Sequence, residues 1–129
     1  MLVNARLFPD MLPLKRQIQI ASDTAKRGAS MLAGAEIPTW EDNEETFAEL
    51  EARIQKTIAY LDGLDRSKFE GAESRTIELP MGQTTLKLDG TSFIMGYGMA
   101  NFSFHVVTAY NILRHNGVSI GKRDYLGAA

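Results

Sequence analysis

The chain has 129 residues, of which 44% are hydrophobic and 23% are charged, a composition typical of one globular domain. Its formal net charge of −2 offers no basic surface, so we expect no nucleic-acid partner. The absence of cysteine excludes disulfides, thiolate metal sites and cysteine nucleophiles. No signal-peptide pattern is present, and polar side chains and glycines interrupt the uncharged run 90–113. We therefore expect a cytoplasmic protein with no membrane partner.

The first predicted helix covers residues 10–33. Asp10 is suited to cap its N-terminus, and Pro13 would then lie in the first turn. Gly34 is predicted to end it. Apolar and small residues recur at spacings of three and four, which indicates one stripe of an amphipathic helix: Met11, Leu14, Ile18, Ala21, Ala25, Gly28 and Leu32.

The second predicted helix covers residues 43–64. Its apolar residues have the spacing of a seam in antiparallel bundle packing: Phe47, Leu50, Ile54, Thr57, Leu61 and Leu64. Glu44 and Glu45 are placed in the first turn, where the helix dipole favours acids. Arg53 is expected to point to solvent. Trp40, just before this helix, is expected to pack against it as a hydrophobic staple or to line the mouth of a pocket.

A change from helical to period-two patterning predicts a β-hairpin over residues 75–88. Strands 75–79 and 84–88 alternate apolar and polar residues, and Pro80 and Gly82 favour a tight turn between them. A last helix over residues 92–115 follows, and Gly117 is expected to end it. Because this helix is apolar nearly all round, we expect it to be buried on most sides.

One narrow stripe of the last helix is polar but uncharged. It contains Asn101, His105, Thr108, Ile112 and His115, at alternating spacings of four and three. Exposed stripes usually carry Lys or Glu, so uncharged polar residues indicate a wet cavity or an internal hydrogen-bond network. The candidate site is therefore centred on His105.

Three interpretations of His105 stay open. It is a core histidine bonded to a carbonyl or an amide, a general base partnered by Tyr110 or Asn101, or a metal ligand that requires Asp10 or Gln17 from elsewhere. His105 and His115 lie about 15 Å apart along the helix and cannot share an ion. We expect neither a metal nor another cofactor, and we assign no catalytic residue.

Two segments resemble a known family. The run from Phe8 to Leu14 with Gln17 after it, and the run from Asn101 to Val118 closing with residues 121–127, are similar to motifs of the family called domain of unknown function 1993. Asp10, Gln17, Asn101, His105 and Tyr110 match these motifs. The family is similar to the DinB/YfiT-like group of four-helix bundles. That group often binds a divalent metal through three histidines, and some members are thiol-dependent transferases or isomerases.

This chain departs from the resemblance in two ways. It has two histidines instead of three, so the metal role is not carried over. The family's usual first helix has no counterpart before Asn4-Ala5-Arg6-Leu7, which predicts a bundle with one face of its core exposed. A contiguous exposed patch of that kind marks an association site. We therefore expect either that the natural product is longer or that a partner subunit of a homo-oligomer covers this face.

The sequence thus predicts one all-α domain over residues 1–129, a DinB-like antiparallel helical bundle with a small hairpin. The expected function is that of an uncharacterised bundle that binds a small molecule or oligomerises. The alternative is a degenerate relative of the DinB-like metal- and thiol-dependent transferases. The candidate pocket combines the polar stripe with the motif residues: His105, Asn101, Thr108, Tyr110, Asp10 and Gln17.

Overall fold

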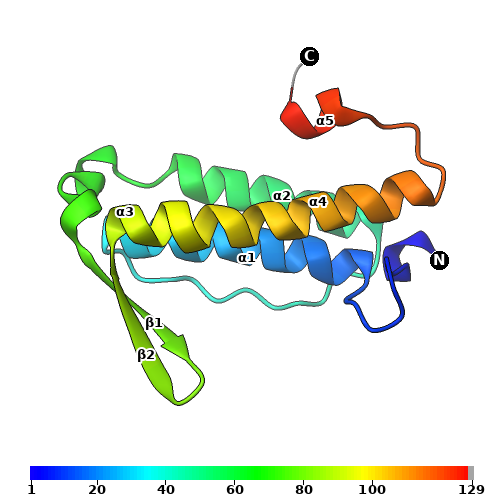
Figure 1. Ribbon diagram of the computed structural model, residues 1–129. Coiled ribbons are helices and arrows are strands. Elements are labelled where there is room, and N and C mark those ends of the chain that lie inside the picture. The colour runs from blue at the N-terminus through cyan, green and yellow to red at the C-terminus, as the bar shows by residue number, and fades with distance from the viewer. Residues whose placement is uncertain (128–129) are drawn as a thin grey trace.

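The computed structural model describes residues 1–127 as a bundle of three long helices with a β-hairpin at one end (Figure 1). The predicted DinB-like all-α class with a hairpin is confirmed. The long helices are α1 (Leu14–Ala33), α2 (Phe47–Asp62) and α4 (Met99–His115). The shorter elements are η1 (Leu2–Asn4), η2 (Arg66–Phe69), η3 (Ala72–Ser74), α3 (Gly90–Phe93), the π-helical η4 (Ile94–Gly98) and α5 (Lys122–Leu126). Within residues 1–127, no helix is both long and apolar enough to cross a membrane.

The helices α1 and α2 run in the same direction, and α4 runs against both (Figure 1). Ser22 of α1 bonds to Arg53 of α2, and Ser30 bonds to Tyr60 about two turns further along both helices, so the two helices run in the same direction. The loop over residues 34–46 returns along the bundle to make this possible. The seam that the sequence predicted on the second helix therefore belongs to a parallel pair, and only α4 is antiparallel to its neighbours.

Both long N-terminal helices begin later than predicted. The carbonyl of Pro13 accepts the first backbone hydrogen bonds of α1, and Asp10 lies exposed in the lead-in instead of capping the helix. At α2, Thr46 and Glu49 form a reciprocal capping box. Glu44 consequently lies in the loop before the helix and not in its first turn.

Arg53 is buried, contrary to the prediction that it points to solvent. Its side chain is 2% exposed and forms ion pairs with Asp23, Asp42 and Glu44 at 2.7, 3.0 and 3.1 Å. Its Nε also donates to Ser22 at 2.7 Å. A buried guanidinium is tolerated because each of its three nitrogens has a hydrogen-bond or ion-pair partner. Arg53 thereby fastens the return loop to α1 and α2.

Trp40 packs in a different place from the predicted staple. Its ring lies edge-on to Tyr60, with the centroids 6.1 Å apart. The ammonium groups of Lys26 and Lys56 lie 4.4 and 4.5 Å from the Trp40 ring centroid. The loop is therefore held by aromatic and cation–π contacts with the C-terminal half of α2, not with its start.

The hairpin of β1 (Thr76–Met81) and β2 (Thr84–Asp89) covers one end of the helices. Ile77 and Leu79 of β1 pack with Phe93 in a buried cluster that also contacts Met31 and Leu32 of α1. The hairpin ends at Gly90, where a Cβ atom would lie 1.8 Å from the carbonyl oxygen of Ala72. Only glycine allows the chain to turn from β2 into the last helix at this distance.

Candidate functional site

An apolar groove lies between α2 and α4, with α1 as its floor. The helix α1 packs against both of the other helices, whereas α2 and α4 flank an open corner of the bundle. A cavity of about 340 Å³ occupies the corner. Its lining is almost entirely apolar, apart from Gln17, Ser22, Thr57 and His105; the remaining residues are Ile18, Ala21, Ala25, Ile54, Ile58, Leu61, Phe102, Val106 and Ala109.

His105 is the one ionisable side chain that lines this groove. Its Nδ1 lies 2.7 Å from Oε1 of Gln17, and Nε2 of Gln17 donates to the carbonyl of Leu12 at 3.0 Å. A backbone carbonyl only accepts, so it fixes the orientation of the Gln17 amide and leaves Oε1 facing the imidazole. Nδ1 of His105 must therefore carry the proton.

The local sequence explains why Gln17 is held so firmly. Pro13 begins α1 and leaves the carbonyl of Leu12 outside the helical hydrogen-bond ladder, where a side chain of the next turn can reach it. Gln17 is 2% exposed, so its amide has few alternatives to the two partners it uses. The start of α1 thus orients a side chain on α4.

The imidazole of His105 is neutral at neutral pH. Burial lowers its pKa below the usual value of 6.5, and the positive charge of Arg16 lowers it further. With the proton on Nδ1, Nε2 carries a lone pair. Nε2 has no hydrogen-bond partner in residues 1–127, where no unpaired side-chain polar atom is buried. This acceptor is consequently open to solvent or to a ligand.

The other predicted site residues do not gather around His105. Thr108 is buried and donates to the carbonyl of Phe104 at 2.7 Å, within its own helix. Asn101 donates to Thr24 of α1 at 3.2 Å and lines a different pocket. Tyr110 is half-buried outside the groove lining, and Asp10 is exposed. Of the six, the structure brings together His105 and Gln17.

The groove itself was not predicted as a site, although its apolar residues were recognised. Ile54 and Leu61 were assigned to a helix–helix seam, and the last helix was expected to be buried. The feature of the sequence that indicates the groove is the amount of apolar surface on the second and last helices. The helix α1 alone cannot cover both α2 and α4. Ile54, Ile58, Met95 and Met99 remain 40%, 47%, 71% and 49% exposed.

A family model described as a domain of unknown function, DUF1993, matches residues 1–126. The chain belongs to the DUF1993 family. A crystal structure of a DinB family member protein from Shewanella denitrificans is 45% identical, with a TM-score of 0.91. The similarity covers 99% of this chain and 72% of that one. No curated protein matches the sequence.

The side chains of this DUF1993 protein do not fit the three-histidine metal centre that the resemblance to DinB-like proteins implies. Residues 1–127 contain no group of three or more His, Cys, Asp or Glu that could hold a metal ion. The nearest polar group to His105 is the amide of Gln17, whose oxygen already accepts from Nδ1. The chain therefore does not assemble a donor set for that chemistry around His105.

Proposed function

We propose that this DUF1993 protein binds a small molecule with an apolar body in the groove between α2 and α4. The observation that carries the proposal is the neutral His105, whose Nε2 is a free acceptor beside an apolar cavity of about 340 Å³. Ligand sites typically combine a mostly apolar lining with a few fixed polar groups. The groove and the Gln17–His105 pair have this combination.

The chemistry of the groove specifies the ligand. An apolar body gains by leaving water for a lining of isoleucine, alanine and valine side chains. A hydroxyl or N–H group on that body donates to Nε2 of His105. A net hydrogen bond of this kind contributes about 1 kcal/mol, which corresponds to a factor of about five in affinity.

Titration with 2-naphthol and with naphthalene tests the proposal, because the two differ by one hydroxyl donor. The wild-type protein is expected to bind 2-naphthol about fivefold more tightly than naphthalene, as measured by fluorescence. In His105→Phe the preference disappears, because phenylalanine offers no acceptor. The matched control His115→Gln changes the other histidine, which is exposed at the end of α4, and should keep the preference. Equal affinities in the wild-type protein would contradict the proposal.

A second candidate function is association through the same face. Ile54 and Ile58 of α2 line the groove and are exposed, and exposed apolar patches mark association sites. Light scattering at increasing concentration is expected to show a dimer that Ile58→Lys dissociates. Phe104→Lys, at an exposed position outside the groove lining, is the control and should leave the mass unchanged. A wild-type monomer at all concentrations would exclude this candidate.

A further inference from the structure

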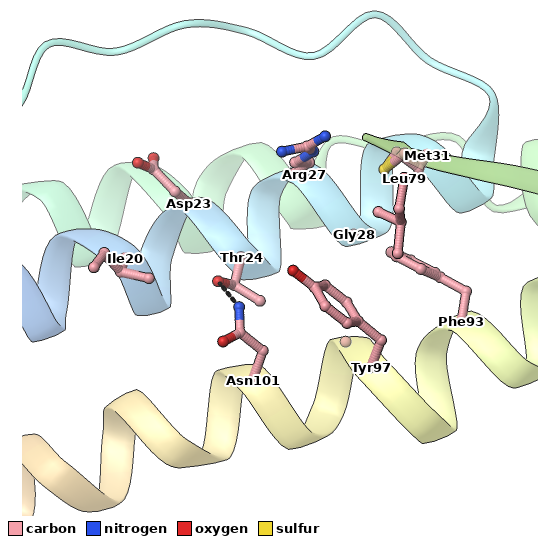
Figure 2. Close-up of a pocket in the computed structure, with 11 residues that line it drawn as sticks. Ile20, Asp23, Thr24, Arg27, Gly28, Met31, Leu79, Phe93, Tyr97 and Asn101 are labelled. Carbon is pink, nitrogen blue, oxygen red and sulfur yellow. Dashed lines mark hydrogen bonds between the residues drawn. The ribbon is translucent and has the colours of Figure 1, made fainter. Parts of the chain in front are cut away.

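A second pocket lies where α1, β1 and the start of the last helix meet, away from His105 (Figure 2). It has a volume of about 230 Å³. Apolar side chains from three elements form part of its wall: Ile20, Met31, Leu79 and Phe93. The polar residues that line it are Asp23, Thr24, Arg27, Tyr97 and Asn101. Figure 2 shows Tyr97 and Asn101 reaching from the last helix toward α1.

Several polar groups of this pocket have no partner within the protein. Arg27 forms no hydrogen bond or ion pair in residues 1–127, and neither does the hydroxyl of Tyr97. Asn101 uses its amide nitrogen to donate to Thr24, which leaves its side-chain oxygen free. None of these atoms is buried without a partner, so all are accessible from the pocket or from solvent.

The cation of this pocket has no acidic partner in residues 1–127. Asp23 also lines the pocket, one turn before Arg27, but its carboxylate pairs with Arg53 at 2.7 Å and with Lys26 at 3.2 Å. Asp23 is therefore held by other cations and forms no ion pair with Arg27. An anion entering the pocket would meet an uncompensated guanidinium.

The backbone at the pocket is unusual. The segment η4 (Ile94–Gly98) is π-helical, within a run that is otherwise α-helical from Gly90 to His115. Single π-helical turns occur frequently at functional sites because they reposition side chains at a cost in helix regularity. Here the turn contains Tyr97 and stacks its ring on Phe93, with centroids 6.2 Å apart and planes 23° apart. Because Phe93 is buried, the exposed ring of Tyr97 supplies the aromatic surface beside its own free hydroxyl.

We propose that this pocket binds a small organic carboxylate with a flat apolar body. The carboxylate accepts from the guanidinium of Arg27 and from the hydroxyl of Tyr97. The body packs on the exposed ring of Tyr97 and on Met31, which line the pocket together with the buried Phe93 and Leu79. The ligand differs from that of the His105 groove because it is anionic, and the two sites share no lining residue.

Calorimetric titration with benzoate tests this site, and benzyl alcohol is the neutral comparison. The wild-type protein is expected to bind benzoate and to lose affinity as salt is added, because the contact is ionic. Arg27→Gln is expected to weaken benzoate binding at least tenfold without affecting benzyl alcohol. Tyr97→Phe should weaken it about fivefold.

Two variants complete the test. Arg114→Gln removes an exposed arginine at the far end of α4 and should leave benzoate affinity unchanged. His105→Phe should also leave it unchanged, so a failure of the groove site would not affect this result. Benzoate binding that survives Arg27→Gln, or that His105→Phe abolishes, would overturn the proposal. So would the absence of saturable benzoate binding to the wild-type protein.

Discussion

At the scale of single residues, a chain of two hydrogen bonds determines what His105 can do. The Leu12 carbonyl orients Gln17, and Gln17 holds the proton of His105 on Nδ1. The result is a neutral imidazole whose Nε2 is an acceptor without a hydrogen-bond partner in residues 1–127. Burial, and then the positive charge of Arg16, lower the pKa of His105 below its usual value.

Stability should therefore depend on pH through His105. Its folded pKa lies below the unfolded value of 6.5, so the unfolded chain binds the proton at a higher pH than the folded protein. The contribution to stability is fully present above about pH 6.5 and is lost as the pH falls toward the lowered folded pKa. Urea unfolding at pH 7 and pH 5 should show a lower free energy of unfolding at pH 5.

His105→Gln should lose part of this pH dependence, since its amide can still donate to Gln17 but does not titrate. His115→Gln should keep the wild-type dependence. The interval from pH 7 to pH 5 lies above the range in which three hydrogen-bonded carboxyls titrate. These are Glu49, Asp65 and Asp89, whose pKa values are lowered by hydrogen bonds. An identical loss of stability in His105→Gln and the wild-type protein would show that His105 is not the titrating group.

Hydrogen bonds and ion pairs between distant residues are the features that the sequence did not predict. Gln17 and His105 are 88 residues apart, and no periodicity within one helix reveals a bond between two. Arg53 was assigned to solvent because charged residues off an apolar stripe usually are. Its three acidic partners come from α1 and the return loop, whose path the local pattern does not encode.

At the scale of elements, local patterns predicted more. Alternation located the hairpin to within two residues at its N-terminal strand, because half-buried strands expose every second side chain. The helices were predicted from their spacings of three and four. Helix starts were less accurate. Asp10 was predicted as an N-cap and Glu44 as a first-turn residue, but Pro13 and Thr46 are the N-cap residues.

Two glycines of the last helical run should respond in opposite ways to alanine. Gly90→Ala is expected to destabilise the protein by several kcal/mol or prevent folding, because its Cβ would overlap the Ala72 carbonyl and rigid backbone cannot yield. Gly96→Ala has no atom within 4 Å of the new Cβ and should stabilise the helix by up to about 1 kcal/mol. Thermal unfolding of both variants measures the difference.

Equal effects of the two substitutions would contradict the packing between α3 and η3. A Gly90→Ala protein that unfolds at the wild-type temperature would mean that the turn from β2 into the last helix has room for a side chain. A Gly96→Ala protein that is strongly destabilised would mean that the π-helical turn requires glycine for its own conformation.

At the scale of the whole molecule, the arrangement of three helices creates the open groove. The class of fold followed from the sequence because stripe spacing and the resemblance agreed. The direction of α2 did not follow, because the same apolar spacing serves parallel and antiparallel neighbours. The helices α2 and α4 both pack on α1 and flank the groove between them, which leaves one corner of the bundle uncovered.

The most direct test of the account is nitrogen-15 NMR of the histidine side chains with and without 2-naphthol at pH 7. We predict that His105 is neutral with its proton on Nδ1, and that saturating 2-naphthol shifts the Nε2 resonance while Nδ1 stays protonated. His115, at the exposed end of α4, should not respond. A protonated His105, a proton on Nε2 in the free protein, or an Nε2 resonance unaffected by saturating 2-naphthol would contradict the account.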